Sequence, residues 1–128
     1  MKLPETVTLK IPVKAEYVST ARLTASGIAS KIGFDFDAIE DIKVSISEVL
    51  GKIIEKQPEA EEIAILFENI SDGLTIKFLL SDNTVSDIFD GDEDSLSLAI
   101  VNSLMDEIDM QKNGQNILTM VKKLGKAV

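Results

Sequence analysis

The sequence predicts an α+β fold, a two-layer sandwich in which helices are grouped around a hairpin-rich antiparallel sheet. Two hairpin signals support this class: SDG separates the β-rich residues 63–70 and 74–80, and KNGQ separates residues 107–111 from 116–121. Three other segments repeat apolar side chains at helical spacing. The predicted order is therefore β-α-α-β-β-α-β-β, which is typical of an α+β domain.

The N-terminal part is predicted to form a strand and then a helix. Residues 6–13 (TVTLKIPV) alternate apolar and polar side chains and end at a proline-containing exit, as a half-buried strand does. Residues 16–32 repeat apolar side chains near helical spacing. Gly33 follows directly, and glycine is the residue that most often ends a helix.

Two more helices are predicted. Asp35 or Asp37 can cap the second, which should end before Pro58 because a residue that precedes proline disfavours helical geometry. Residues 96–105 (LSLAIVNSLM) repeat apolar side chains at helical spacing and predict the third. Residues 84–94, which precede it, form a polar and acidic connection.

Composition limits the chemistry that the chain can perform. With no domain boundary or repeat evident, residues 1–128 are predicted to be one domain. The sequence has no cysteine and no histidine, which excludes thiolate metal sites and Ser-His or Cys-His catalysis. A net charge of −9, with Arg22 as the sole arginine, argues against direct binding to nucleic acid. The first residues, MKLPETVTLK, lack the apolar core of a signal peptide, so a soluble cytoplasmic protein is expected.

One family resemblance covers nearly the whole chain. Residues 16–48 (EYVSTARLTASGIASKIGFDFDAIEDIKVSISE) resemble the N-terminal half of the bacterial anti-sigma factor serine kinases, the RsbW and SpoIIAB type. SLMDEI (103–108) with the final hairpin is similar to the C-terminal part of that family, and the likeness is weakest in 82–95. These kinases belong to the GHKL ATPase superfamily, so the resemblance implies the Bergerat form of the two-layer sandwich.

The resemblance places a catalytic pair of residues on the second helix. The family has a glutamate there as general base and, four residues later, an asparagine that helps to hold Mg²⁺ against ATP. Glu48 stands at the base position and Lys52 at the asparagine position. Residues i and i+4 share one helix face, so both point into one pocket. Lysine has three donors and no acceptor, so Lys52 cannot ligate Mg²⁺.

The other nucleotide motifs of the family also differ here. In its DxGxG motif the aspartate accepts from adenine; Asp82 is retained, but Thr84 and Ser86 replace the glycines. At the phosphate-binding turn that opens the third helix, Ser95 and Ser97 replace glycines. A Cβ at such positions disfavours positive φ and close backbone approach. The sequence therefore predicts that the ATP and Mg²⁺ site is degenerate.

The charge of this region agrees with that prediction. Residues 82–97 contain no basic side chain and six acidic ones, Asp82, Asp87, Asp90, Asp92, Glu93 and Asp94. A triphosphate would therefore enter a segment of its own sign. The DxDxD of residues 90–94 is similar to the start of a calcium loop, but Ser95 and Val101 stand where the loop needs glycine and a bidentate acid. We interpret it as a solvated acidic loop that could also dock a basic partner.

Two residues keep alternative interpretations. Lys52 can be a surface partner of Glu48 or Glu55, can fill the metal site between Glu48 and Asp82, or can bind phosphate directly without a metal. Arg22 can be an ordinary surface arginine or, by the resemblance, a contact to a partner protein on the first helix.

The leading functional hypothesis is an anti-sigma-type regulator, a pseudo-kinase that acts by protein–protein binding and needs no cofactor. The resemblance implies a sigma factor or a STAS-domain anti-anti-sigma protein as partner. It also implies a homodimer formed through the N-terminal strand and first helix. The alternative is an active serine kinase that uses ATP and Mg²⁺ to phosphorylate the STAS protein, with Glu48 as base. A third hypothesis is a structural dimerisation module.

Overall fold

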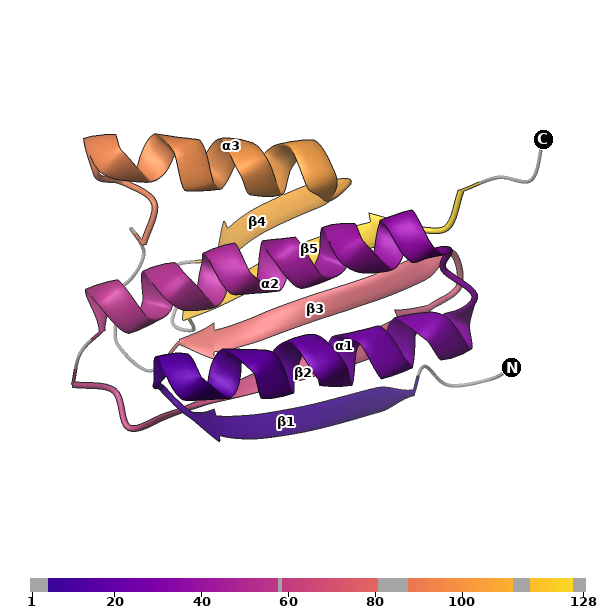
Figure 1. Cartoon of the computed structure of the whole chain (residues 1–128), viewed down its shortest axis with the longest axis horizontal. Helices are drawn as coiled ribbons and strands as arrows, with labels where there is room; N and C mark the ends of the chain where they lie inside the picture. The colour runs from indigo at the N-terminus through magenta and orange to yellow at the C-terminus, as the bar shows by residue number, and fades with distance from the viewer. Residues whose placement is uncertain (1–4, 58, 81–87, 112–115, 126–128) are drawn as a thin grey trace.

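A five-stranded antiparallel sheet carries α1, α2 and α3 on one of its faces (Figure 1). The computed structural model describes residues 5–57, 59–80, 88–111 and 116–125. The sheet order is β1-β2-β3-β5-β4. The elements are β1 Thr6–Pro12, α1 Val18–Ile32, α2 Phe36–Lys56, β2 Glu62–Ile70, β3 Gly73–Leu80, α3 Ser95–Leu104, β4 Glu107–Gln111 and β5 Asn116–Lys123, with short 3-10 turns at Ala15–Tyr17 and Asp92–Asp94.

The predicted fold class and element order are confirmed. The first helix begins at Val18 rather than Glu16, because the residues before it form a 3-10 turn. Gly33 ends that helix with φ 111°, a left-handed conformation that favours glycine. Of the two candidate caps for α2, Asp35 takes the position, and its carboxylate accepts from the Ala38 N–H at 2.8 Å.

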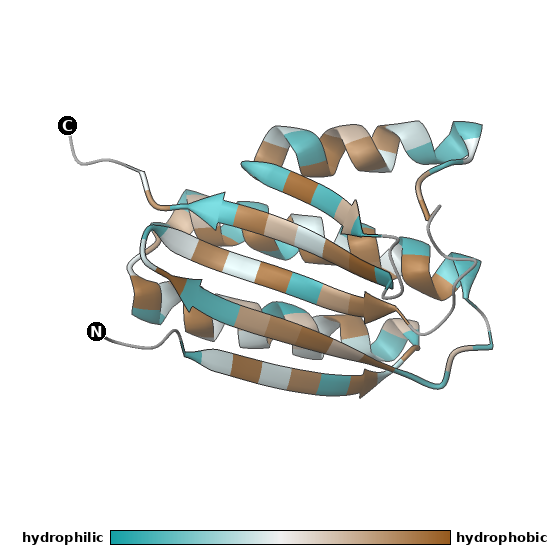
Figure 2. Ribbon diagram, turned by 180° about the vertical axis from the view of Figure 1, so that it is seen from behind, coloured by the Kyte–Doolittle hydropathy of each residue, from teal (hydrophilic) through white to brown (hydrophobic). Residues whose placement is uncertain are grey.

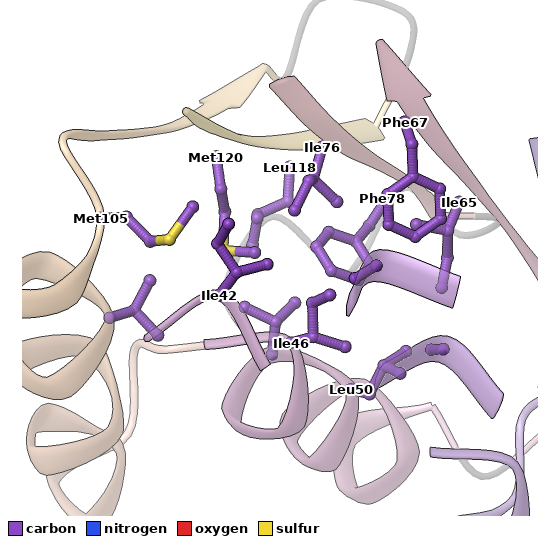
Figure 3. Close-up of a cluster of buried hydrophobic side chains, with 14 of the residues drawn as sticks. Ile42, Ile46, Leu50, Ile65, Phe67, Ile76, Phe78, Met105, Leu118 and Met120 are labelled. Atoms are coloured by element: carbon purple, nitrogen blue, oxygen red, sulfur yellow. The ribbon is translucent and has the colours of Figure 1, made fainter. Parts of the chain in front are cut away.

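Strand alternation directs one set of apolar side chains from the sheet to the helices. Paired residues on neighbouring antiparallel strands share a face, so Phe78 and its partner Leu118 both point inward. Ile46 and Leu50 of α2 lie over them, and all four side chains are almost completely buried (Figure 3). None of the described helices lies across the other face of the sheet, which mixes hydrophilic with hydrophobic residues (Figure 2). The core therefore lies between the sheet and the helices.

Two of the helices pack closely, and the third has fewer buried residues. Small side chains at every fourth position of α1, Ala21, Ala25 and Ala29, are fully buried, which allows α1 to lie tightly on its neighbours. In α3 only Val101 is buried. That helix lies beside α2, above β4 at the edge of the sheet (Figure 1). Polar contacts are therefore important for its position.

The end of α3 is held by a lysine from the last strand. The Lys122 ammonium donates to the carbonyl oxygen of Leu104, the last residue of α3, at 2.6 Å. The same ammonium lies 3.4 Å from a carboxylate oxygen of Asp41 on α2. A cation at a helix C-terminus also interacts favourably with the helix dipole. Within the described residues, no helix is both long and apolar enough to cross a membrane.

Candidate functional site

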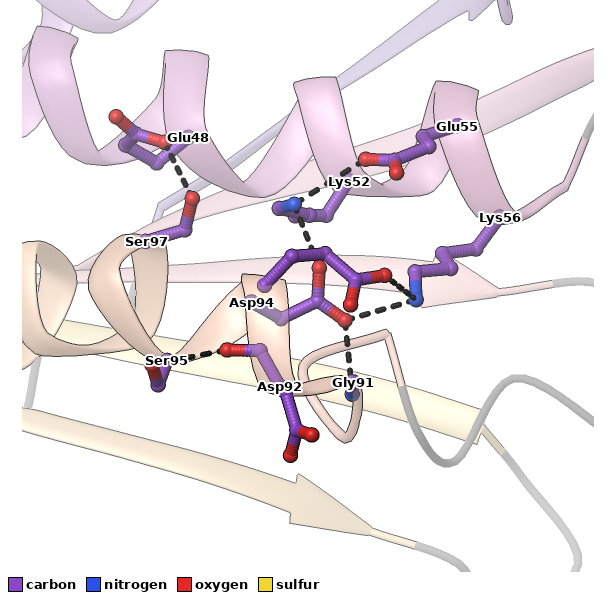
Figure 4. A network of polar contacts seen from close by, with 10 residues as sticks. Glu48, Lys52, Glu55, Lys56, Gly91, Asp92, Asp94, Ser95 and Ser97 are labelled. Atoms are coloured by element: carbon purple, nitrogen blue, oxygen red, sulfur yellow. Dashed lines mark hydrogen bonds and ion pairs between the residues drawn. The ribbon is translucent and has the colours of Figure 1, made fainter.

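Three charged side chains lie along one face of α2, opposite the start of α3. Glu48, Lys52 and Lys56 are spaced four residues apart, which places them on the same side of the helix. They all contact the segment from Gly91 to Ser97, which contains the 3-10 turn and the first turn of α3 (Figure 4). The predicted base and metal-ligand positions therefore face α3.

Asp94 joins the two lysines. Its Oδ1 lies 2.6 Å from the Lys52 ammonium, and its Oδ2 lies 2.8 Å from the Lys56 ammonium. The same Oδ2 accepts from the Gly91 N–H at 2.9 Å (Figure 4). We call Lys52, Lys56, Asp94 and the Gly91 N–H the Asp94 cluster. Both carboxylate oxygens thus accept hydrogen bonds from charged or backbone donors.

Burial makes this contact different from a surface ion pair. The Asp94 side chain is 0% exposed, and those of Lys52 and Lys56 are 13% and 26% exposed. Hydrogen bonds from Lys52 and then Lys56 lower the pKa of Asp94 to about 2, against the opposing effect of desolvation. The hydrogen bond to Asp94 raises the pKa of each lysine. All three groups are therefore charged at neutral pH.

Two further carboxylates lie at the edge of the cluster. Glu55 is 3.2 Å from the Lys52 ammonium, and Glu93 is 3.9 Å from that of Lys56. Their side chains are 51% and 68% exposed, so solvent screens both contacts. Glu55, Glu93 and Asp94 have carboxylate oxygens within 4.8 Å of one another. This trio does not suit a divalent cation, because two ammonium groups already contact Asp94.

Serine hydroxyls bond where the family resemblance places glycines. Ser97 donates to Oε2 of Glu48 at 3.0 Å, which ties the predicted base position to α3. Ser95 donates to the carbonyl oxygen of Asp92 at 3.1 Å and closes the 3-10 turn (Figure 4). Glycine could make neither bond. These two positions therefore connect the first turn of α3 to its surroundings.

One interpretation of charge from the sequence is found in the structure, and another needs correction. The pairing of Lys52 with Glu55 is found, but among the described residues Lys52 forms no ion pair with Glu48. The interpretation of residues 90–94 as solvated is wrong for Asp94, which is fully buried, although Asp90 and Asp92 are exposed. The negative charge of this segment is thus partly neutralised by α2. Asp82, Thr84 and Ser86 lie outside the described residues.

Sequence reasoning missed Lys56 and Gly91. A signal was present, because Lys56 follows Lys52 by four residues on the same helix face. If the side chains of Lys52 and Lys56 are half-buried, an anionic side chain has to lie nearby. The sequence contains several acidic residues that could be this partner. Gly91 contributes through its backbone N–H, which no side-chain pattern reveals.

Arg22 contacts the neighbouring helix. Its Nη1 donates to the Ser47 hydroxyl at 2.5 Å, and the residue is half-buried. The next residue, Leu23, is 70% exposed. Arg22 therefore contacts α2 and is followed in α1 by an exposed apolar side chain. The interpretation as a simple surface arginine is incomplete, and a role in partner contact stays a prediction.

The described residues do not fit the Mg²⁺ ion that the fold family implies. The position predicted to ligate the metal carries an ammonium group that has no acceptor and is bonded to Asp94. The carboxylate of Asp94 already contacts two ammonium groups and a backbone N–H. A divalent ion there would lie against two positive charges.

Comparison with known proteins agrees with the predicted fold and family. A family model described as the histidine kinase-like ATPase domain matches residues 11–122. The chain belongs to this family, and within it to the RsbW-like anti-sigma serine kinases. It is 37% identical over 134 residues to "Serine-protein kinase RsbW" of Bacillus cereus (strain Q1), covering 89% of this chain and 82% of the relative. The same values hold for the protein of that name from Bacillus thuringiensis subsp. konkukian (strain 97-27).

A solved structure supports the architecture. The chain matches the crystal structure of the RsbU and RsbW domains of Rv1364c from Mycobacterium tuberculosis with a TM-score of 0.72. The match covers 97% of this chain and 34% of that one, at 17% identity. At this identity the similarity supports the fold alone.

Proposed function

We propose that this chain is an anti-sigma-type regulator that acts by binding protein partners and does not carry out Mg²⁺-dependent phosphoryl transfer. The main observation behind this proposal is the Asp94 cluster. It joins α2 to the start of α3 at the position where the family resemblance places the metal ligand. The partners proposed from family membership are a sigma factor and a STAS-domain antagonist.

The positive charges of the cluster support the proposal that no magnesium ion binds there. Lys52 presents an ammonium where an amide oxygen would be needed, and Lys56 brings a second positive charge to the same carboxylate. A magnesium ion would have to displace two close, charge-assisted contacts and then remain beside both lysines. Substituting one residue would leave the other ammonium in place.

An active serine kinase is the second candidate, and the names of the relatives favour it. Proteins named serine-protein kinase RsbW are 37% identical to this chain over 89% of its length. Glu48 is retained at the family's base position, and its carboxylate already accepts from a serine hydroxyl, that of Ser97. In this candidate Glu48 is the general base, and ATP and Mg²⁺ are required cofactors.

Nucleotide binding separates the two candidates. We expect no saturable binding of a fluorescent ATP analogue at micromolar protein, with or without Mg²⁺, measured by fluorescence anisotropy. Lys52→Asn alone should not create Mg²⁺-dependent binding, because Lys56 continues to hold Asp94. Tight binding that requires Mg²⁺ in the wild-type chain would contradict the proposal and support the kinase.

The exposed side of α1 is the surface that we propose for partner binding. Its exposed residues are small, polar or charged except for one apolar side chain, and they are Ser19, Thr20, Leu23, Gly27, Ser30 and Lys31. Arg22 borders this surface with a guanidinium that can reach partner carboxylates. A second copy of the chain is also a proposed occupant, in line with the predicted homodimer and with the dimerisation-module hypothesis.

Co-purification from the native host tests this surface. The tagged wild-type chain should recover a sigma factor or a STAS-domain protein, identified by mass spectrometry, and Arg22→Ala should reduce that recovery several-fold. Ser47→Ala is the matched control, because it removes the internal hydrogen bond and leaves the guanidinium in place. Equal recovery with wild type and Arg22→Ala would count against a docking role of Arg22.

A further inference from the structure

We propose that the outer edge of β4 and the groove between β4 and α3 form a docking site for a basic, extended segment of a partner protein. The segment pairs with β4 as an additional strand, places an apolar side chain in the groove and directs lysine or arginine side chains to acidic residues of the site. β4 and β1 are the two edges of the sheet, and α1 lies on the β1 side (Figure 1). The site is therefore separate from the α1 surface, and the inference goes beyond the proposed function.

An open groove of about 440 Å³ lies between α3, β4 and the residues just before the 3-10 turn at Asp92–Asp94. Its volume is within the range of pockets that hold ligands. The apolar part of its lining consists of half-buried side chains from all three of these segments, and they are Phe89, Leu98, Ile108 and Met110. The groove can therefore bury an apolar side chain that enters from the edge of the sheet.

β4 is an edge strand of the described sheet, because it pairs with β5 on one side only. The backbone N–H and C=O groups on the outer side of such a strand can pair with an added strand. Ile108 pairs with Met120, which is fully buried, so Ile108 and its alternate neighbour Met110 point to the helix layer. A strand added beside β4 therefore sends alternate side chains into the groove under α3 (Figure 1).

The charge of the groove indicates the chemistry of the partner. Asp90 and Asp109 belong to its lining, which contains no cationic side chain. Both aspartates are exposed, and within the described part of the chain neither forms an ion pair. The pocket at the β1 edge differs, because its lining includes Lys31 as well as Glu5. Basic side chains are therefore favoured at the β4 edge, where they lie opposite unpaired carboxylates.

The same charges disfavour a second copy of this chain as the occupant. In an antiparallel β4–β4 pair centred on Asp109, the two Asp109 side chains would lie directly opposite each other. Like charges at such positions destabilise strand pairing. Glu107 lies on the same face of the strand and adds negative charge, although the Lys123 ammonium is 3.3 Å from its carboxylate. The charge pattern therefore favours a basic partner over self-association.

Peptide binding tests the site. A fluorescein-labelled peptide KVKVKVK should bind the wild-type chain about tenfold more tightly than EVEVEVE, measured by fluorescence anisotropy at constant ionic strength. Asn102→Lys places an ammonium in the groove lining and should weaken binding of KVKVKVK about tenfold. Ser103→Lys is the matched control: it adds the same charge at the next exposed position of α3, outside the groove lining, and should weaken binding about twofold at most.

A second pair of variants tests the acidic edge. Asp109→Asn keeps the side-chain size and should weaken binding of KVKVKVK several-fold, whereas Glu61→Gln, which removes an exposed charge before β2, should not. The proposal is overturned if Asn102→Lys binds the peptide as tightly as Ser103→Lys does, or if the wild-type chain binds both peptides equally.

Sedimentation velocity tests the other occupant. We expect Asn102→Lys to leave the oligomeric state unchanged. A dimer of the wild-type chain that Asn102→Lys abolishes would assign the site to a second copy and overturn the proposal. These assays measure peptide binding and self-association, so their outcome is independent of whether a sigma factor or a STAS-domain protein is recovered through α1.

Discussion

Asp94→Ala should lower the free energy of unfolding several-fold more than Asp92→Ala. Removal of the carboxylate leaves Lys52 and Lys56, whose side chains are 13% and 26% exposed in the wild-type structure, without their shared anion. Breaking a buried ion pair by removing one partner is costly, because the remaining charge stays desolvated. Urea unfolding at pH 7, followed by circular dichroism, measures both variants. Similar losses for Asp92→Ala and Asp94→Ala would contradict the structural importance of the cluster.

The same carboxylate should make stability depend on acid. Its folded-state pKa of about 2 lies below the ordinary value of 3.8, so its contribution is complete at pH values well above 3.8. That contribution is lost as the pH falls through the range between 3.8 and about 2. The wild-type unfolding midpoint should therefore fall more steeply from pH 5 to pH 2 than that of Asp94→Asn. Parallel pH profiles would refute this assignment.

Phe78→Ala should cost about 3–5 kcal/mol of unfolding free energy. The ring is 0% exposed and lies between β3 and α2, close to Ile46 and Leu50 (Figure 3). Its loss removes apolar burial and leaves a cavity that the surrounding sheet and helix can only partly fill. Chemical denaturation at constant pH gives the value directly.

The next residue in the strand provides the control. Leu79 points to the opposite face of the sheet and is 37% exposed, so Leu79→Ala should cost only about 1 kcal/mol or less. The paired variants test the register of β3 as well as the core. Equal costs for the two substitutions would mean that the second face of the sheet is covered in solution.

Local patterns were sufficient to predict the elements of the fold. Gly33 and Asp35 mark a helix end and the next helix start through bonds within three or four residues, so the sequence could reveal both. The inward and outward sides of the strands follow from alternation alone. Family resemblance then selected the arrangement of these elements, which periodicity by itself does not determine.

The site was less predictable because its contacts are long-range. Asp94 and Lys52 are 42 residues apart in sequence, and Ser97 and Glu48 are 49 residues apart. Before folding, nothing distinguished Asp94 from its exposed neighbours Asp90 and Asp92. The helical spacing correctly placed Glu48 and Lys52 on one face, but it did not indicate that each has its own partner on the α3 side.

Lysines contact both ends of helix α3, and few of its side chains are buried. Lys122 holds its C-terminal carbonyl, Lys52 and Lys56 hold the turn before its first residue, and Val101 is the buried point along its length. The Ser97 hydrogen bond to Glu48 lies beside the Asp94 contacts, so charged and polar groups of α2 hold the first turn of α3. The placement of this helix on α2 therefore depends more on charge than on apolar burial.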